Sequence, residues 1–319
     1  MLESRSGRDG MERSWGSNPF EVLVYLVTVP LLHGLARLPL RVLYRISDVA
    51  FWFVYRILRL RRAVARDNLR RSFPEISAVE RSRIEERCYR HQCDVAFESL
   101  KLMTMGADEI RDRMRGNLAV GYELFDRRQG AIFVLGHCGN WEWAIPLAVL
   151  SFPKALIHII YHPIRHAGFD DLVRSVRTRF GGMLTPIEQA PRAIVRTRNE
   201  LAATFLVADQ RAHSRNPYIT DFLGQPTAFL RGPERLARSL DVPVVYVEMT
   251  RVERGRYEVN LEWLCEDPSA TSDGEITERF ARRLERQIRK APEDWLWQHR
   301  RWRDRRAERA SAGSRVGSA

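Results

Sequence analysis

The sequence predicts an α/β protein with a mixed, largely parallel central sheet flanked by helices, and with an N-terminal membrane-associated helical segment. Short apolar runs alternate with longer amphipathic segments along residues 120–290, which is the pattern of strands joined by crossover helices. The runs are apolar on both faces, as expected for strands buried in a parallel sheet. Residues 19–60 differ, because they are apolar and aromatic with arginines at their edges.

The N-terminal segment contains two apolar stretches. Residues 22–36 are mostly apolar but shorter than the ~20 residues that span a bilayer. Residues 42–60 carry clustered aromatic side chains and a line of arginines, which is typical of an interfacial helix. We expect an anchor, either one tilted span or a monotopic hairpin; the alternative is two buried helices of a soluble domain. The arginine excess after residue 36 predicts that the rest of the chain faces the cytoplasm.

The remaining elements follow from hydrophobic periodicity. Helices are expected at 61–73, 79–105, 169–180, 192–199, 233–240 and 275–290, and strands at 131–135, 155–161, 201–208, 242–250 and 257–264. Ser77 and Glu80 form a capping box for the second helix, and residues 211–225 are expected to be a loop. The predicted division is a mobile N-terminus (1–18), an anchoring segment (19–60), a main domain (61–303) and a basic disordered tail (304–319).

The net charge narrows the class of partner. Lysine and arginine number 52 against 40 acidic residues, a formal net charge of +12, which favours a polyanionic partner. Nucleic-acid-binding motifs are absent from the sequence, so we assign the charge to membrane or phosphate contact and expect no nucleic-acid partner. The four cysteines form no C-x-x-C pair and are expected to be reduced, structural thiols.

A histidine and a carboxylate follow the first predicted strand. His137 and Glu142 lie in the turn between residues 131–135 and a helix that starts near Trp143, where open α/β sheets bind their ligands. A carboxylate bonded to one ring nitrogen makes the other a general base, so we expect Glu142 to orient His137. The bare spacing also fits a histidine bonded to a backbone carbonyl beside a surface glutamate; the position after a buried strand favours the catalytic interpretation.

Several other chemistries are disfavoured. No G-x-S-x-G elbow surrounds His137, so the base is expected to act on a hydroxyl of the substrate itself. His158, His162 and His166 recur at every fourth position, but Pro163 argues against a helix that would bring them together, and no metal site is expected. The sequence has neither a P-loop nor a dinucleotide fingerprint, and no cofactor is expected.

At this point the residues carry a family resemblance. GHCGNWEW, residues 136–143, resembles the H-x-x-x-x-D/E motif of the lysophospholipid acyltransferase superfamily. More narrowly, residues 20–303 resemble the late acyltransferases of lipid A biosynthesis, the lauroyl and myristoyl transferases. The matching elements are RRAVARDNLRRSFPE at 61–75, Arg177 with Arg179, Asp209 with Gln210, and PEDWLWQHRRW at 292–302. His162 departs from the family pattern, because many members have arginine there.

The resemblance implies a glycerolipid-acyltransferase-like fold and a bacterial inner-membrane enzyme whose catalytic domain faces the cytoplasm. The implied reaction moves a fatty acyl chain from a thioester, on acyl carrier protein or CoA, to a hydroxyl of a membrane lipid, most directly a lipid A precursor, without a covalent intermediate. His137 would be the base and Glu142 its orienting partner; the implied substrate-binding residues are Arg177, Asp209, Asn140, Arg179 and Gln210. Alternatives are a glycerolipid, aminolipid or glycolipid acceptor, and a basic membrane-bound protein without activity.

Overall fold

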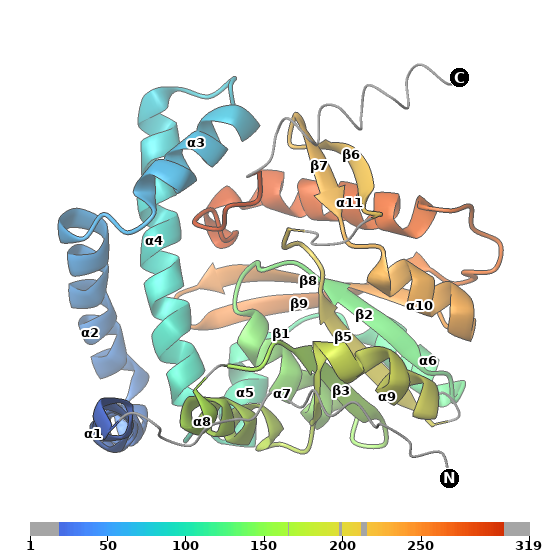
Figure 1. Cartoon of the computed structure of the whole chain (residues 1–319), viewed down its shortest axis with the longest axis horizontal. Coiled ribbons are helices and arrows are strands. Elements are labelled where there is room, and N and C mark those ends of the chain that lie inside the picture. Colours follow the sequence, from blue (N-terminus) through green and yellow to red (C-terminus); the bar gives the residue numbers. More distant parts are fainter. Residues whose placement is uncertain (1–18, 165, 198–199, 212–215, 303–319) are drawn as a thin grey trace, which may run out of the picture.

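The computed structural model describes residues 19–164, 166–197, 200–211 and 216–302 (Figure 1). The segments predicted as a mobile N-terminus (1–18) and a basic tail (304–319) lie outside the described residues. The central element is a seven-stranded sheet with the order β1-β9-β8-β2-β5-β3-β4. Its strands are β1 (Met114–Arg115), β2 (Ala131–Leu135), β3 (Leu156–Tyr161), β4 (Met183–Pro186), β5 (Ala202–Val207), β8 (Val244–Glu253) and β9 (Arg256–Cys265).

The sheet is mostly parallel, as predicted. Strands β8 and β9 pair antiparallel, and all other neighbours in the sheet pair parallel. The antiparallel pair follows from the short turn at Gly255, which has a φ of 76° and therefore suits glycine. The α/β class and the mixed, largely parallel sheet are confirmed.

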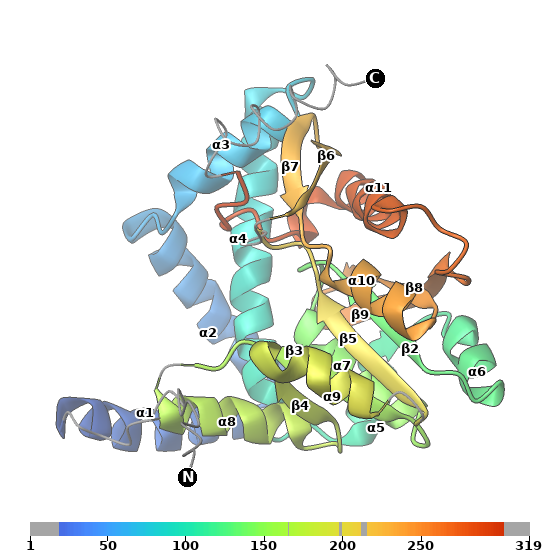
Figure 2. The same cartoon turned by 45° about the vertical axis from the view of Figure 1, so that its right-hand side comes forward.

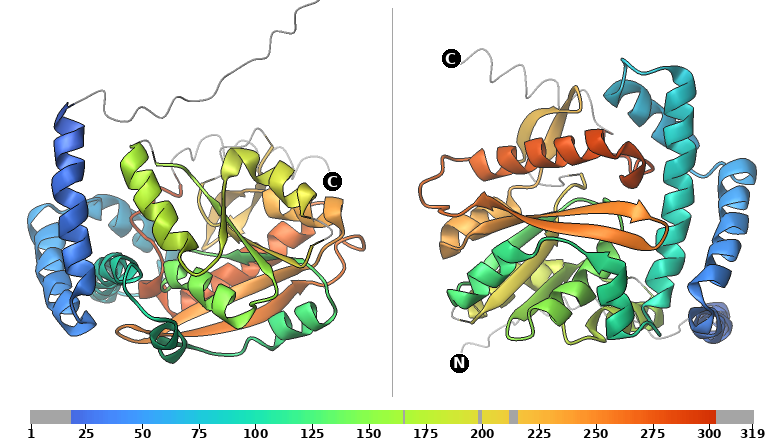
Figure 3. Two further views of the ribbon diagram at one scale, coloured as in Figure 1. Left: turned by 90° about the horizontal axis from the view of Figure 1, so that it is seen from below. Right: turned by 180° about the vertical axis from the view of Figure 1, so that it is seen from behind.

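Helices cover both faces of the sheet (Figures 1 and 3). The helices that follow the N-terminal segment are α3 (Arg62–Ser72), α4 (Ala78–Lys101), α5 (Ala107–Arg113), α6 (Ala119–Asp126), α7 (Trp141–Ser151), α8 (Ala167–Thr178), α9 (Ala190–Arg196), α10 (Gly232–Leu240) and α11 (Glu275–Lys290). Strand β2 separates two hydrophobic cores, because successive side chains point to opposite faces. Phe133 packs in the core that contains Trp143 of α7, whereas Val134 packs in the core that contains Phe280 and Leu284 of α11.

Three parts of the strand pattern differ from the prediction. Strand β1 was not expected, because it has only two residues and follows a helical, charged segment. Strand β4 was not expected, since it is short and ends at a proline. Residues 211–225, expected to be a loop, contain β6 (Tyr218–Phe222), which pairs antiparallel with β7 (Gln225–Phe229). The hairpin is hard to detect because β6 contains polar residues and β7 contains Pro226, which weakens the strand signal.

The N-terminal segment forms α1 (Pro19–Arg37), α2 (Leu40–Trp52) and a π-helix (Phe53–Ile57). Helix α1 runs beside α8 (Figure 2), where the rings of Tyr25 and His166 stack with centroids 5.7 Å apart. One face of α2 packs on the body, and Ser47 Oγ donates to Asp94 of α4 over 2.7 Å. Among the described helices, none combines the length and the hydropathy needed to cross a bilayer.

The opposite side of this segment is exposed and apolar. Its exposed side chains are Val22, Val24, Leu26, Val27, Leu31, Val42, Val49, Trp52, Phe53, Ile57, Leu58 and Leu60. Scattered exposed apolar residues are normal in proteins, but a continuous series from consecutive elements is characteristic of an interaction surface. We refer to these residues as the apolar N-terminal surface.

Candidate active site

The site lies where two neighbouring parallel strands end. Strands β2 and β5 pair in register, with Leu135 opposite Val207. His137 and Asp209 each follow two residues after these positions, so the two side chains leave the same edge of the sheet at the same level. His137 Nδ1 is 2.5 Å from Asp209 Oδ1. The backbone N–H of His137 donates to Asp209 Oδ2 over 2.8 Å.

Asp209 is fixed by a third donor from a distant part of the chain. Trp295 Nε1 donates to Asp209 Oδ2 over 2.8 Å, and both residues are buried. Burial alone would raise the pKa of Asp209, but the charge of His137 and these hydrogen bonds lower it below its usual range. Asp209 is therefore an anion that accepts hydrogen bonds at physiological pH.

The ionised Asp209 sets the state of the His137 ring. Burial alone would lower the pKa of His137, but the charge of Asp209, the hydrogen bond to it and the charge of Glu142 outweigh burial and raise the pKa. With Nδ1–H donated to Asp209, Nε2 of the neutral ring is an acceptor, a tautomer assigned from the hydrogen bonds. Gln210 Nε2 lies 3.2 Å from His137 Nε2, and the edge of Trp141 packs near the ring.

Glu142 has a different partner from the one expected. Its carboxylate forms a bidentate ion pair with Arg177 of α8, with Nε–Oε2 at 3.0 Å and Nη2–Oε1 at 2.5 Å. The expected contact between Glu142 and the His137 ring is thus made by Asp209 instead. Sequence proximity suggested Glu142, but it begins α7, whereas β5 brings Asp209 from a distance of 72 residues.

The His137 ring and the Glu142–Arg177 pair line one cavity of about 680 Å³. One part of its wall is polar, with His137, Glu142, Arg177, Gln210, Arg211, His162 and His299. The other part is apolar and includes Trp141, Ala144, Ile145, Ile159, Ile187, Phe205 and Leu206. A cavity of this size with few converging polar groups is typical of a site for a small amphipathic ligand.

Comparison with known proteins identifies the chemistry. The model of the bacterial lipid A biosynthesis acyltransferase family matches residues 15–304. The chain belongs to this family. It is 22% identical over 249 residues to the lipid A biosynthesis myristoyltransferase of Escherichia coli strain K12, and the match covers 77% of this chain and 76% of that protein. Lipid A biosynthesis acyltransferase 1 of Shigella flexneri matches with the same identity and coverage. The family resemblance is confirmed, and the protein is an acyltransferase.

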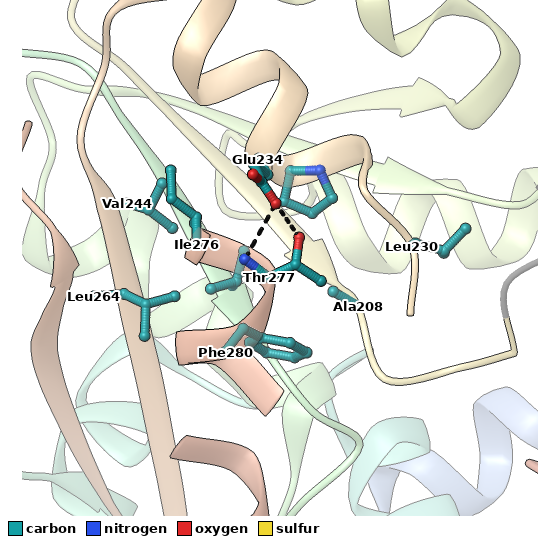
Figure 4. Close-up of a pocket in the computed structure, with 10 residues that line it drawn as sticks. Ala208, Leu230, Glu234, Val244, Leu264, Ile276, Thr277 and Phe280 are labelled. Carbon is teal, nitrogen blue, oxygen red and sulfur yellow. Dashed lines mark hydrogen bonds between the residues drawn. The ribbon is translucent and has the colours of Figure 1, made fainter. Parts of the chain in front are cut away.

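A second pocket of the acyltransferase lies on the other face of the sheet (Figure 4). It is lined by side chains of α10, α11 and neighbouring strands, and its volume is only about 10 Å³. That is about the space of one water molecule, so an acyl chain cannot enter without a rearrangement. Glu234 closes this pocket and accepts from the backbone N–H of Thr277 over 3.2 Å, which caps the start of α11. The cavity beside His137, of about 680 Å³, is much larger than this second pocket.

Three of the five expected substrate-binding residues do not line the large cavity. Asp209 is buried and holds His137 instead. Asn140 is fully buried and donates to Glu98 Oε2 over 2.8 Å. Its side chain also caps α7 by accepting from the N–H of Trp143. Arg179 donates to backbone carbonyls of Leu102 and Met105, over 3.0 and 2.5 Å. Neither residue lines the large cavity, so both hold the structure around the site rather than face a ligand.

Metal ligands do not gather in the described part of the chain. No group of three or more histidine, cysteine, aspartate or glutamate residues is arranged to hold an ion there. His158 is buried in β3, whereas His162 lies in the wall of the cavity. His166 caps α8 through Phe169, with Nδ1 accepting from the backbone N–H over 3.4 Å. The three regularly spaced histidines thus lie in three different environments and do not converge.

The C-terminal segment supplies residues that the sequence did not assign to the site. Trp295 anchors Asp209, and His299 lines the cavity. Asn68 of α3 holds this segment in place, because its Nδ2 donates to the backbone carbonyls of Trp297 and His299 over 2.9 and 3.0 Å. The sequence signals were the match of residues 292–302 to the family and the cluster of tryptophans, which equally suits core packing.

Proposed function

We propose that this acyltransferase moves a fatty acyl chain from a thioester, on acyl carrier protein or CoA, to a hydroxyl of a membrane lipid, and that the acceptor is a lipid A precursor. The observation that carries the proposal is the imidazole of His137, which is hydrogen-bonded to Asp209 and lines a cavity with both polar and apolar residues. The reaction needs a base that takes the proton of the acceptor hydroxyl, and it needs an apolar wall that binds the fatty acyl chain. Each buried methylene contributes about 0.8 kcal/mol to binding.

The transfer requires no covalent enzyme intermediate. Nε2 of His137 takes the proton of the acceptor hydroxyl while its oxygen attacks the thioester carbonyl carbon. A new C–O bond forms, and the carbonyl oxygen becomes an oxyanion. When the C–S bond breaks, the oxyanion reforms the carbonyl, and the imidazolium returns its proton to the leaving thiolate. Asp209 stabilises the imidazolium between the two proton transfers.

The oxyanion needs positive or N–H donors near Nε2. Arg177 and Gln210 both line the cavity and are the candidates. Glu142 holds the Arg177 guanidinium by two parallel hydrogen bonds, which fixes its plane. Gln210 reaches the base itself, 3.2 Å from His137 Nε2, so an incoming hydroxyl would take its place and leave the amide free to donate to the oxyanion.

The apolar N-terminal surface supports attachment to a membrane. Its exposed aliphatic and aromatic side chains lie beside arginines at positions 41, 45, 56, 59 and 61, as in interfacial helices. We propose attachment to the bacterial inner membrane through residues 19–60, with the catalytic domain (61–303) facing the cytoplasm. A lipid acceptor would then approach the cavity from the bilayer.

One residue favours an alternative acceptor. His162 lies in the wall of the cavity, at a position where the family resemblance implies an arginine, so one cation of the expected site is replaced by a histidine. The alternative is the same transfer to a glycerolipid, aminolipid or glycolipid. Mass spectrometry of membrane lipids from cells with the wild-type protein or His137→Ala would identify the acylated species.

The direct test is acyl transfer by purified protein from acyl-acyl carrier protein and from acyl-CoA to a lipid A precursor. His137→Ala should lower the rate at least ~10²-fold, with an unchanged unfolding midpoint. His33→Ala is the matched control, because His33 lies on α1 and its ring bonds to the backbone carbonyl of Val29 rather than to a residue of the cavity. Wild-type activity in His137→Ala would refute the catalytic assignment.

A further inference from the structure

A cleft lined by arginines opens at the start of α3. Arg59, Arg62, Ala63 and Arg66 surround a volume of about 430 Å³. We call this the arginine cleft. Helix α3 begins there without a side-chain cap, so its first N–H groups add a partial positive charge. The cleft is separate from the His137 cavity, and the two share no lining residue.

A single buried carboxylate holds two of the guanidinium groups. Glu85 Oε1 accepts from Arg62 Nε over 2.7 Å, and Glu85 Oε2 accepts from Arg66 Nε over 2.8 Å. Both arginines use the Nε edge, and the outer nitrogens of Arg66 have no hydrogen bond within the described residues. Two cations share one anion, so the pair keeps a net positive charge while its position is fixed. Such a fixed fork is suited to bidentate recognition of phosphate.

Arg59 adds a third cation in an unusual backbone conformation. Its φ is 49°, in the left-handed region that a non-glycine residue seldom adopts. Its side chain forms no hydrogen bond or ion pair in the part of the chain that the structure describes, so packing gives no reason for an arginine there.

The surroundings indicate which kind of phosphate would reach the cleft. Ile57, Leu58 and Leu60, which flank Arg59, are 52–55% exposed and end the apolar N-terminal surface. Helix α3, which begins at the cleft, also contacts the active site, because Asn68 Nδ2 donates to the backbone carbonyl of His299, a residue in the wall of the cavity, over 3.0 Å. The cleft thus lies beside the apolar N-terminal surface, at the start of a helix that contacts the wall of the catalytic cavity.

We propose that the arginine cleft binds the phosphate group of an anionic membrane lipid. Arg59 and Arg66 contact the phosphate, Arg62 and Glu85 hold the cleft in shape, and Leu58 and Leu60 enter the acyl region beside the headgroup. The inference rests on the proposed membrane attachment. It adds that the attachment includes a specific contact with a lipid phosphate. Binding there would orient the His137 cavity toward lipids of the same leaflet.

Vesicle flotation with purified full-length protein tests this site. The probes are vesicles of phosphatidylcholine, with or without phosphatidic acid. Wild type should bind the anionic vesicles more tightly, and Arg59→Gln/Arg66→Gln should lose about tenfold or more of that affinity. Arg128→Gln is the matched control, because Arg128 is also exposed, has a φ of 54° and lies in the turn after α6. It should bind as wild type does.

The outcomes separate the sources of the effect. Equal binding by the double variant and wild type, or an equal loss in Arg128→Gln, would overturn the proposal. Full competition of inorganic phosphate with vesicle binding would also overturn the proposal. So would a double variant that loses binding to acyl carrier protein but keeps its binding to vesicles. The single variant Arg59→Gln should show a smaller loss. It guards against misfolding, because the Arg59 side chain has no hydrogen bond or ion pair with any residue that the structure describes. His137→Ala should bind vesicles normally, so failure of the proposed transfer reaction would leave this result intact.

Discussion

Asp209 lies at the end of β5 with its Oδ1 2.5 Å from His137 Nδ1 at the end of β2, and it accepts the backbone N–H of the same histidine through Oδ2. One carboxylate therefore fixes both the ring and the main chain of the proposed base. The pair resembles the His–Asp arrangement of general-base enzymes in its logic, since the anion selects the tautomer and stabilises the imidazolium.

Asp209→Asn should abolish most activity and change its pH dependence. The amide oxygen can still accept from His137 N–H and Trp295, which leaves the amide NH₂ facing Nδ1. The ring must then accept at Nδ1 and carry its proton on Nε2, so the base is lost. We expect a fall of at least ~10²-fold in kcat/KM.

The pH profile shows whether the charge of Asp209 acts on His137. Asp209 raises the pKa of His137, so wild-type activity should rise with pH through a pKa above the usual value of a histidine. Without that charge the imidazolium is less stable, and the acid limb of the remaining activity should move to lower pH. A reduced rate with an unmoved acid limb would mean that Asp209 serves the fold alone.

The Glu142–Arg177 pair offers a second test, because its two charges act on His137 in opposite directions. The charge of Glu142 raises the pKa of His137, and that of Arg177 lowers it. Glu142→Gln should therefore move the acid limb of kcat/KM to lower pH, and Arg177→Gln should move it to higher pH. The double variant should lie near the wild-type position.

The same variants separate positioning from direct contact. If Glu142 acts by holding Arg177, Glu142→Gln should lose less activity than His137→Ala. The double variant Glu142→Gln/Arg177→Gln should then be only slightly less active than Arg177→Gln alone. We expect about 10²-fold for Arg177→Gln, which is the typical loss when one oxyanion donor is removed. Additive losses in the double variant would show that Glu142 has a role of its own.

The sequence predicts the elements of this fold better than their arrangement. The run AIFVL and the amphipathic pattern of 275–290 each specify one element, and the structure has both with those bounds. The order of the strands in the sheet cannot be predicted from such local patterns, because it depends on which faces of the sheet the crossover helices cover. The sequence therefore could not show that β5 lies beside β2.

Because the sequence did not show that β5 lies beside β2, it also did not show that Asp209 is the partner of His137. Glu142 is five positions away, in the first turn of α7, so it was the nearer carboxylate in sequence. Asp209 follows its strand just as His137 follows β2, two residues after the paired positions. A search for polar residues at equivalent strand ends would have found the pair. The Trp295 contact could not be found this way, because no periodic pattern links it to the sheet.

Trp295→Phe should weaken catalysis by releasing Asp209. The ring still fills its buried site, but Asp209 Oδ2 loses the donor at 2.8 Å, so the carboxylate is less well held and its pKa rises. We expect a fall of about tenfold in kcat with little change in KM, together with a shift of the acid limb. Steady-state kinetics across pH measure both.

Trp302→Phe provides the matched control for this substitution. Trp302 is also buried, and its Nε1 donates to Thr227 Oγ1 over 2.7 Å, not to Asp209. Each substitution removes one buried hydrogen bond of about 1 kcal/mol, so the losses in stability should be similar. If both variants lose the same activity, the Trp295–Asp209 hydrogen bond has no special role.

Asn140→Ala should destabilise the fold more than an ordinary cap substitution does. Asn140 caps α7 and also donates to the buried carboxyl of Glu98, whereas Ser77 caps the more exposed start of α4 over 3.1 Å. Loss of a cap costs about 1 kcal/mol, and a buried acceptor left short of a donor adds about 1–3 kcal/mol. Chemical unfolding should therefore give about 2–4 kcal/mol for Asn140→Ala and about 1 kcal/mol for Ser77→Ala. Equal losses would mean that water replaces Asn140 at Glu98, and that the link between α4 and the catalytic turn adds no stability.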